Sequence, residues 1–158
     1  MKTNSSYKPV GGVESVALYP ADAVVTALFS SNGCEIELSG NSIEVPLLDD
    51  ASQYDEISRL EHGAASVLHK LNLVANRKDA EKWLDSAFLE RAAFEGFIAV
   101  VSLSSGQSLL VGYSAHLGNE QPLRLESLTT SSGKTLHETP SVTLRLVSCD
   151  ADLAVQIL

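Results

Sequence analysis

The sequence predicts a mainly β (α+β) fold, an antiparallel β-sandwich or barrel with one amphipathic helix, about Lys78 to Glu95, packed on it. Three observations predict this class. Short apolar runs rich in β-branched residues recur at regular spacing, turn-forming residues separate them, and a single stretch has helical spacing. The 158 residues, 44% of them hydrophobic and 20% charged, are enough for one domain with its own core.

The stretch from Gly96 to Glu126 is predicted to be the centre of the fold. Phe97–Val101 and Ser108–Ser114 have the composition of strands, and Ser104–Gln107 supplies a turn between them. Alternation places Leu109, Val111 and Tyr113 on one face of the second strand and Leu110, Gly112 and Ser114 on the other. Since both faces carry apolar residues, this hairpin is expected inside its sheet and not at an edge.

Four short strands are predicted before this hairpin, separated by turns that contain Pro, Gly or Asn. In the third, Ile36 and Leu38 face one way and Glu35 and Glu37 the other, so one side is exposed to water. Residues 1–12 are polar and glycine-containing, which indicates a flexible N-terminal arm, followed by a single β-rich domain over residues 13–158. The four strands are Val13–Tyr19, Val24–Ser30, Cys34–Ser39 and Ser42–Leu47.

The segment from Asp49 to Arg77 allows two interpretations. Its apolar residues fit a helical stripe interrupted by Gly63, and they also fit the alternation of strands. We prefer two long antiparallel strands, about Tyr54–Glu61 and Ser66–Ala75.

The helix over Lys78–Glu95 is predicted from apolar residues at i, i+3, i+4 and i+7 spacing, with Gly96 at its end. Trp83 and Phe88 lie on its apolar stripe and could form either a ligand platform or part of the core. Such a stripe is usually core, so we expect the helix to cover a sheet face.

The C-terminal third is predicted to contain an extended segment at Pro122–Leu128, a polar loop at Thr129–Thr139 and an alternating strand at Ser141–Ser148. The apolar tail after Asp150 is expected to be docked, with another subunit as one candidate partner.

Composition excludes several classes of protein. No export signal is expected, because residues 1–12 are polar and glycine-containing, and no apolar run in the sequence is long enough to cross a membrane. The net charge of −9 disfavours tight binding of nucleic acid. Cys34 and Cys149 have no CxxC or histidine-rich surroundings, so both are expected to be buried free thiols without a metal.

No catalytic motif occurs in the chain, and the expectation is a protein without enzyme activity or cofactor. The four histidines lack the spacing of metal ligands. The acidic residues Asp49, Asp50, Asp55 and Glu56 could form a cation or acid/base site, but nothing apolar surrounds them, and a solvated loop is the simpler interpretation. The histidines are His62, His69, His116 and His137.

Several short motifs support a resemblance to a family. They are LVGYS at Leu110–Ser114, EQPLRL at Glu120–Leu125, SGK at Ser132–Lys134 and the Thr-containing strand from Val142 to Asp150. With these motifs the chain resembles small structural proteins encoded by tailed phages and prophages of Bacteroidetes bacteria. The resemblance marks Gly112, Tyr113, Pro122, Arg124 and Gly133 as the structural motif residues.

The resemblance implies a tail-tube-like virion component that assembles into rings with copies of itself and with other virion proteins. Its expected location is the virion, or the host cytoplasm before assembly. Glu35, Glu37 and Glu44 lie on outward strand faces and could line a lumen that repels DNA. The alternative is a stand-alone binding module of the immunoglobulin-like or carbohydrate-binding type, and a hydrolase built from scattered residues is a third.

Overall fold

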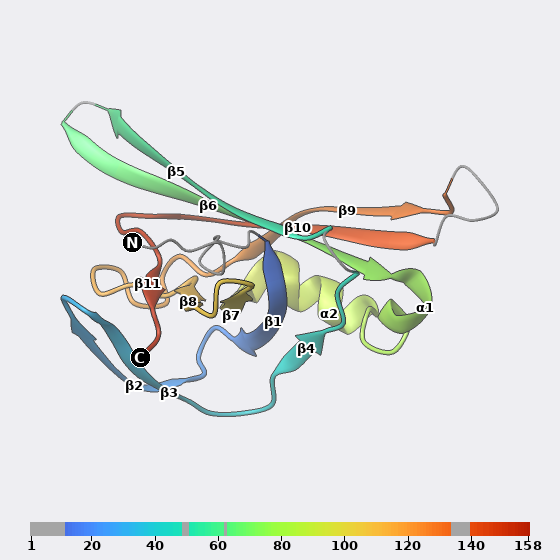
Figure 1. Cartoon of the computed structure of the whole chain (residues 1–158), viewed down its shortest axis with the longest axis horizontal. Coiled ribbons are helices and arrows are strands. Elements are labelled where there is room, and N and C mark those ends of the chain that lie inside the picture. Colours follow the sequence, from blue (N-terminus) through green and yellow to red (C-terminus); the bar gives the residue numbers. More distant parts are fainter. Residues whose placement is uncertain (1–11, 49–50, 62, 134–139) are drawn as a thin grey trace, which may run out of the picture.

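The computed structural model describes residues 12–48, 51–61, 63–133 and 140–158, and in these ranges the fold is mainly antiparallel β, as predicted (Figure 1). The helical segments are α1 (Arg77–Ala80), α2 (Ser86–Glu90) and the π-helical turn η2 (Arg91–Glu95). The strands are β1 (Val13–Pro20), β2 (Val24–Ser30), β3 (Gly33–Leu38), β4 (Ile43–Val45), β5 (Gln53–Glu61), β6 (Ala64–Asn76), β7 (Phe97–Leu103), β8 (Ser108–Val111), β9 (Arg124–Ser131), β10 (Ser141–Asp150) and β11 (Val155–Gln156).

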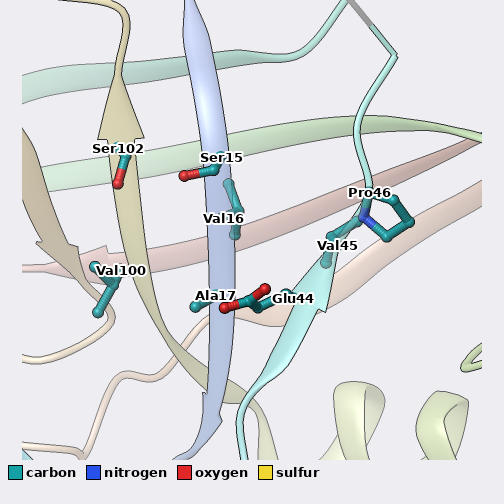
Figure 2. A pocket seen from close by; sticks show the side chains of 8 residues that line it. All are labelled: Ser15, Val16, Ala17, Glu44, Val45, Pro46, Val100 and Ser102. Carbon is teal, nitrogen blue, oxygen red and sulfur yellow. The ribbon is translucent and has the colours of Figure 1, made fainter. Parts of the chain in front are cut away.

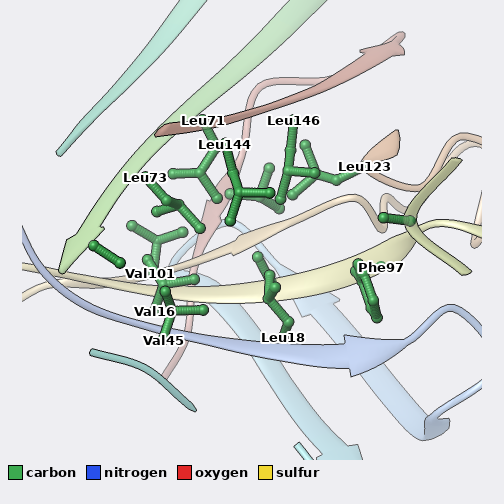
Figure 3. Close-up of a cluster of buried hydrophobic side chains, with 14 of the residues drawn as sticks. Val16, Leu18, Val45, Leu71, Leu73, Phe97, Val101, Leu123, Leu144 and Leu146 are labelled. Atoms are coloured by element: carbon green, nitrogen blue, oxygen red, sulfur yellow. The ribbon is translucent and has the colours of Figure 1, made fainter. Parts of the chain in front are cut away.

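Two sheets pack face to face and enclose the main core (Figure 3). The five-stranded sheet has the order β11-β8-β7-β1-β4, and the four-stranded sheet has the order β5-β6-β10-β9. Both sheets end in free strands in the described residues, so the fold is a sandwich and not a closed barrel. The fully buried side chains between the sheets include Leu18, Phe97 and Val101 from the first, and Leu71, Leu73, Leu144 and Leu146 from the second.

The hairpin of β2 and β3 covers part of the outer face of the five-stranded sheet. Cys34 packs there against Ile98 and Leu110 in a second, smaller core cluster. The β7–β8 hairpin is therefore covered on both faces, and β7 lies in the middle of its sheet, as predicted. Tyr113 was expected on the face of Leu109 and Val111 but packs in the second cluster instead.

The structure resolves the ambiguous segment as two strands. β5 and β6 pair over nine residues, from Gln53 opposite Asn72 to Glu61 opposite Ala64, so the helical interpretation is wrong. Val67, His69, Leu71 and Leu73 are buried at alternate positions of β6, which is the strand period. The far end of this hairpin projects beyond the sandwich (Figure 1).

The single helix predicted over Lys78–Glu95 is interrupted between Ala80 and Ser86. The cause is a second helix start, because the Asp85 carboxylate accepts a hydrogen bond of 2.8 Å from the Phe88 amide. Phe88 is buried and stacks on Phe97. Trp83 packs edge-on against Phe88, with the two ring centres 5.0 Å apart. The core interpretation of the Trp83–Phe88 stripe is therefore confirmed.

Three expectations about the C-terminal region and the thiols can be checked. The tail docks on its own chain, where Val155 of β11 pairs with Leu110, so another subunit is not needed. Cys34 is buried as expected, and this burial raises the pKa of its thiol. Cys149 is exposed, so its expected burial is wrong, because Ser148 and Asp150 occupy the core-facing positions of β10.

Other boundaries differ by a few residues. β4 has only three residues and ends before Pro46, and Thr129–Ser131 continues β9 instead of starting the loop. The predicted arm, except Gly12, and most of the polar loop lie outside the described residues.

Candidate functional site

The four-stranded sheet has two long outer edges. β5 pairs only with β6, and β9 pairs only with β10, so in the described part of the chain the outer side of each edge strand has no strand partner. An edge strand exposes a row of unpaired main-chain N–H and C=O groups, which can pair with another strand. The edges of the five-stranded sheet are much shorter, with three residues in β4 and two in β11.

The outer face of the four-stranded sheet is not covered by another layer of the described residues, since its second layer lies entirely on the core side (Figure 1). Alternation places mixed charges on this outer face. They include Asp55, Arg59, Lys70, Arg124 and Arg145, and Glu126 lies 3.7 Å from Arg145.

Large apolar side chains are exposed beside both edges. Leu60, near the far end of β5, is 82% exposed, and Phe94, at the end of the helix, is 78% exposed. Phe94 lies next to β9, because the Arg124 guanidinium donates a hydrogen bond of 3.4 Å to its carbonyl oxygen. Single exposed apolar residues are common on protein surfaces, so these two are of interest only for their position beside the open edges.

A shallow cavity of about 430 Å³ lies on the outer face of the five-stranded sheet (Figure 2). Small side chains line most of it, and Glu44 is the one ionisable residue among the described residues of its wall. A single carboxylate without a basic or nucleophilic partner does not make a catalytic arrangement. The other lining residues are Ser15, Val16, Ala17, Val45, Pro46, Val100 and Ser102.

A polar network around the buried His69 joins the C-terminal segment to the four-stranded sheet. His69 Nε2 lies 2.9 Å from the Asp152 carbonyl oxygen, so this nitrogen donates, and Nδ1 accepts from the Tyr54 hydroxyl at 2.6 Å. Burial, and then the nearby Glu56 carboxylate, raises the pKa of Tyr54, which keeps the hydroxyl protonated as a donor. The Glu56 carboxylate accepts a hydrogen bond of 2.7 Å from the Ala154 amide. These hydrogen bonds attach the C-terminal segment to β5 and β6, so we interpret the network as structural.

His116 and Asp152 form an exposed pair, with Nδ1 2.8 and 3.0 Å from the two carboxylate oxygens. The hydrogen bond to Asp152, and then its negative charge, raises the pKa of His116 above the ordinary 6.5. The stabilisation from this pair is therefore full below pH 6.5 and is lost as the pH rises through the raised pKa. We expect an NMR titration of His116 to give a midpoint above that of the unfolded chain, and Asp152→Asn to remove most of the difference, since Asp150 makes only a smaller contribution. A wild-type midpoint at or below the unfolded value would contradict the pairing.

Four of the five motif residues lie near the point where the chain crosses between the sheets. Phe97 and Leu123 form a β-bridge there, and a Cβ at Gly112 would lie 2.8 Å from the Phe97 carbonyl oxygen. Pro122 packs against Gly96, the residue before Phe97. Tyr113 stacks on Phe29 of the β2–β3 hairpin, with ring planes 6° apart. Arg124 reaches the end of the helix, and Gly133 lies away from this group, at the end of β9.

Glu35, Glu37 and Glu44 are all exposed, as predicted from their strand faces. Glu35 and Glu37 lie on the β2–β3 hairpin, and Glu44 lies on β4 of the five-stranded sheet. All three are on the side of the sandwich opposite the four-stranded sheet.

The suspected acidic site does not form in the described residues. Asp55 and Glu56 are neighbours on β5 and point to opposite faces, while Asp49, Asp50, His62 and His137 lie outside the described ranges. Within those ranges, no three histidine, cysteine or carboxylate side chains come close enough to hold a metal ion. None of the described helices is long and apolar enough to cross a membrane.

Comparison with known proteins gave no match to a family model, to a curated protein or to a solved structure.

Proposed function

We propose that this chain is a non-enzymatic structural protein of a phage or prophage, a tail-tube-like subunit that assembles into rings through the edges of its four-stranded sheet. The observation that carries the proposal is the pair of long outer edges, β5 and β9, on a sheet whose outer face is uncovered in the described residues. Other virion proteins are its further partners, and its location is the virion or, before assembly, the host cytoplasm.

Strand direction supports a ring. Neighbouring strands alternate in direction across the sheet, so β5 and β9 run in opposite directions. Rotation about a ring axis preserves strand direction, and β5 of one copy therefore meets β9 of the next as an antiparallel pair. Such head-to-tail contacts use both edges of the four-stranded sheet in every subunit and leave neither of these two edges exposed when the ring closes.

The relative position of the two edges supports a closed barrel. Leu128 of β9 and Leu73 of β6 both stand opposite Leu144, and continuing the β5–β6 register puts Ser52 at this level. Without any displacement, Leu128 at the centre of β9 would therefore lie level with Ser52, just before β5 begins. For β9 to pair along its whole length with β5 of the next copy, Leu128 must stand opposite Glu56 or Ser58, which is a displacement of four or six residues from Ser52. The number is even because core-facing residues must stay on one face.

This displacement converts into a strand tilt. Four strands span about 19 Å of circumference at about 4.8 Å each, and each residue along a strand adds about 3.3 Å. Displacements of four and six residues then give tilts of about 35° and about 45°, the range found in closed barrels.

The ring has a defined inner face. The five-stranded sheet, the helix and the β2–β3 hairpin all lie on one side of the four-stranded sheet, and this bulk requires the larger radius (Figure 1). The uncovered face of the four-stranded sheet then lines the lumen. In this arrangement Glu35, Glu37 and Glu44 lie away from the lumen, so the proposed ring replaces the acid-lined lumen expected from the sequence.

A stand-alone binding module is the second candidate, and the cavity beside Glu44 is the observation in its favour (Figure 2). The described residues that line this cavity include no aromatic side chain, whereas sugars are commonly bound against aromatic rings. A glycan affinity that Glu44→Gln abolishes, in a chain that stays monomeric, would support this candidate.

Proline substitutions test the ring. The N–H groups of an edge strand point alternately to its partner and to solvent, so one of the neighbouring positions Ser58 and Arg59 has an N–H that points away from β6. Ser58→Pro and Arg59→Pro are made separately, and the variant with the smaller change in melting temperature identifies that position. We expect wild type to form closed rings in light scattering and negative-stain images, and this variant to remain a monomer.

The proline variant that melts lower is the control for loss of a β5–β6 hydrogen bond. A wild-type chain that stays monomeric at all concentrations, or rings that persist in the better-folded proline variant, would contradict ring closure through β5.

A further inference from the structure

The exposed Leu60 is not explained by the fold of the single chain. Its β5 neighbours Tyr54 and Glu56 face the core side, and alternation puts Leu60 on that same side, where 82% of it remains exposed. A leucine at this position adds little packing to its own chain, and it lies at the edge that the proposed ring uses.

The two registers allowed by the tilt place different residues opposite each other. Glu126 is an extra, bulged residue of β9, because Ser127 pairs with Arg145 and Leu125 pairs with the next residue, Leu146. When Glu126 is left out of the count, the four-residue displacement places Arg124 of one copy directly opposite Arg59 of the next. Like charges directly opposite on neighbouring strands destabilise the pair. With the six-residue displacement, Leu125 stands opposite Leu60 and Ser127 opposite Arg59.

The six-residue register also matches charge and apolar surface. Glu126, beside Ser127, is exposed, and its carboxylate lies 3.7 Å from the Arg145 guanidinium. A carboxylate therefore lies near the incoming Arg59. Leu125 faces the core side, as Leu60 does, and its neighbour Arg124 is hydrogen-bonded to the carbonyl oxygen of Phe94. Leu60 and Phe94 are the two large apolar side chains with the highest exposed fractions in the described residues. This register brings them to the same end of the joint, the contact between β5 of one copy and β9 of the next.

We infer that neighbouring copies join in the six-residue register, with Leu60 of one copy packed against Leu125 and Phe94 of the next. This contact rests on the proposed ring and specifies its register. The partner is thus a second copy of this chain, and the β5–β6 hairpin is the element that reaches it (Figure 1).

Disulfide trapping distinguishes the registers. Both experiments use a Cys149→Ser background, and Cys34 is kept because it is buried. Arg59→Cys with Ser127→Cys places two thiols opposite each other across the six-residue joint, whereas Ile57→Cys with Ser127→Cys does so across the four-residue joint. Opposite Cβ atoms are about 4.5–5.5 Å apart and diagonal ones about 7–8 Å, so only the opposite pair cross-links efficiently.

We expect a ladder of cross-linked oligomers when Arg59→Cys is combined with Ser127→Cys, and little cross-linking when Ile57→Cys is combined with Ser127→Cys. The reverse result overturns the Leu60 contact and leaves the proposed ring intact. Rings without either cross-link overturn both the contact and closure through these edges. A chain without oligomers overturns the proposed function and this contact together.

A substitution tests the contact directly. We expect Leu60→Ser to weaken self-association by roughly tenfold to a hundredfold, since an apolar side chain no longer leaves water at the joint. Leu28→Ser is the matched control, because Leu28 is 67% exposed on the β2–β3 hairpin, away from both edges. Equal self-association of the two variants, measured by sedimentation, overturns the inference.

Discussion

Gly112→Ala is expected to destabilise the folded chain by about 3 kcal/mol or more, because two independent costs add. Gly112 has a φ of +91°, a conformation that residues with a side chain rarely adopt. Its new Cβ would also lie 2.8 Å from the Phe97 carbonyl oxygen and 3.2 Å from the Leu123 amide nitrogen. Those two main-chain groups belong to the bridge between the sheets and cannot move separately.

Gly106→Ala is the matched control for this prediction. Gly106 has a similar φ of +97°, but no atom of the described residues lies within 4 Å of the place that a Cβ would take there. It should cost only the backbone strain, about 1 kcal/mol. Denaturant unfolding of both variants in a Leu60→Ser background, where assembly is weakened, measures the difference. Equal losses at the two glycines would refute the proposed contact of the Gly112 Cβ with the bridge.

The conformation of Gly112 also explains why the position of Tyr113 could not be predicted. Alternation gave the correct faces for Leu109, Leu110 and Val111, which obey the strand period. The positive φ of Gly112 ends that period, and the next side chain joins the second cluster. Glycine allows such a φ but does not require it, so the sequence alone could not show on which face of the sheet Tyr113 lies.

The strands were predictable because their alternation is a local property. β10 shows this most clearly, with Val142, Leu144 and Leu146 buried and Arg145 exposed. The break in the predicted helix was harder to detect, since apolar spacing continues through Trp83 and Leu84. Asp85 was the available signal, because an aspartate before a helical stretch can start a new helix by capping it.

The candidate assembly edges could not be predicted, because they depend on strand order. β6 pairs with β10 across a long stretch of sequence, and only this pairing leaves β5 and β9 at the outside. Leu60 was recognisable as an apolar position of a strand, but its exposure depends on β5 extending past the rest of the sandwich (Figure 1). The two-residue period of a strand shows which face a side chain lies on, but it does not show whether another element covers that face.

Phe97→Ala is expected to cost about 3–5 kcal/mol of stability, the range for loss of a buried aromatic ring. Phe97 is fully buried and stacks on Phe88 at 5.3 Å, so it joins the helix to the five-stranded sheet. Its main chain exchanges two hydrogen bonds with Leu123, at 2.8 and 2.9 Å, where the chain enters the four-stranded sheet. The Phe97 side chain therefore fills the space where the helix and both sheets meet. A neighbouring side chain could fill that space only by giving up one of its own contacts.

Phe94→Ala is the matched control, because it removes the same ring from a side chain that is 78% exposed and only a few residues away. In the Leu60→Ser background its effect on unfolding should be within about 0.5 kcal/mol of zero. The pair of variants separates two roles: Phe97 should change the denaturation midpoint, and Phe94, tested with Leu60 intact, should change self-association. A Phe97→Ala loss below about 1 kcal/mol would mean that the junction collapses around the cavity, and that helix and sheets are not joined through this ring.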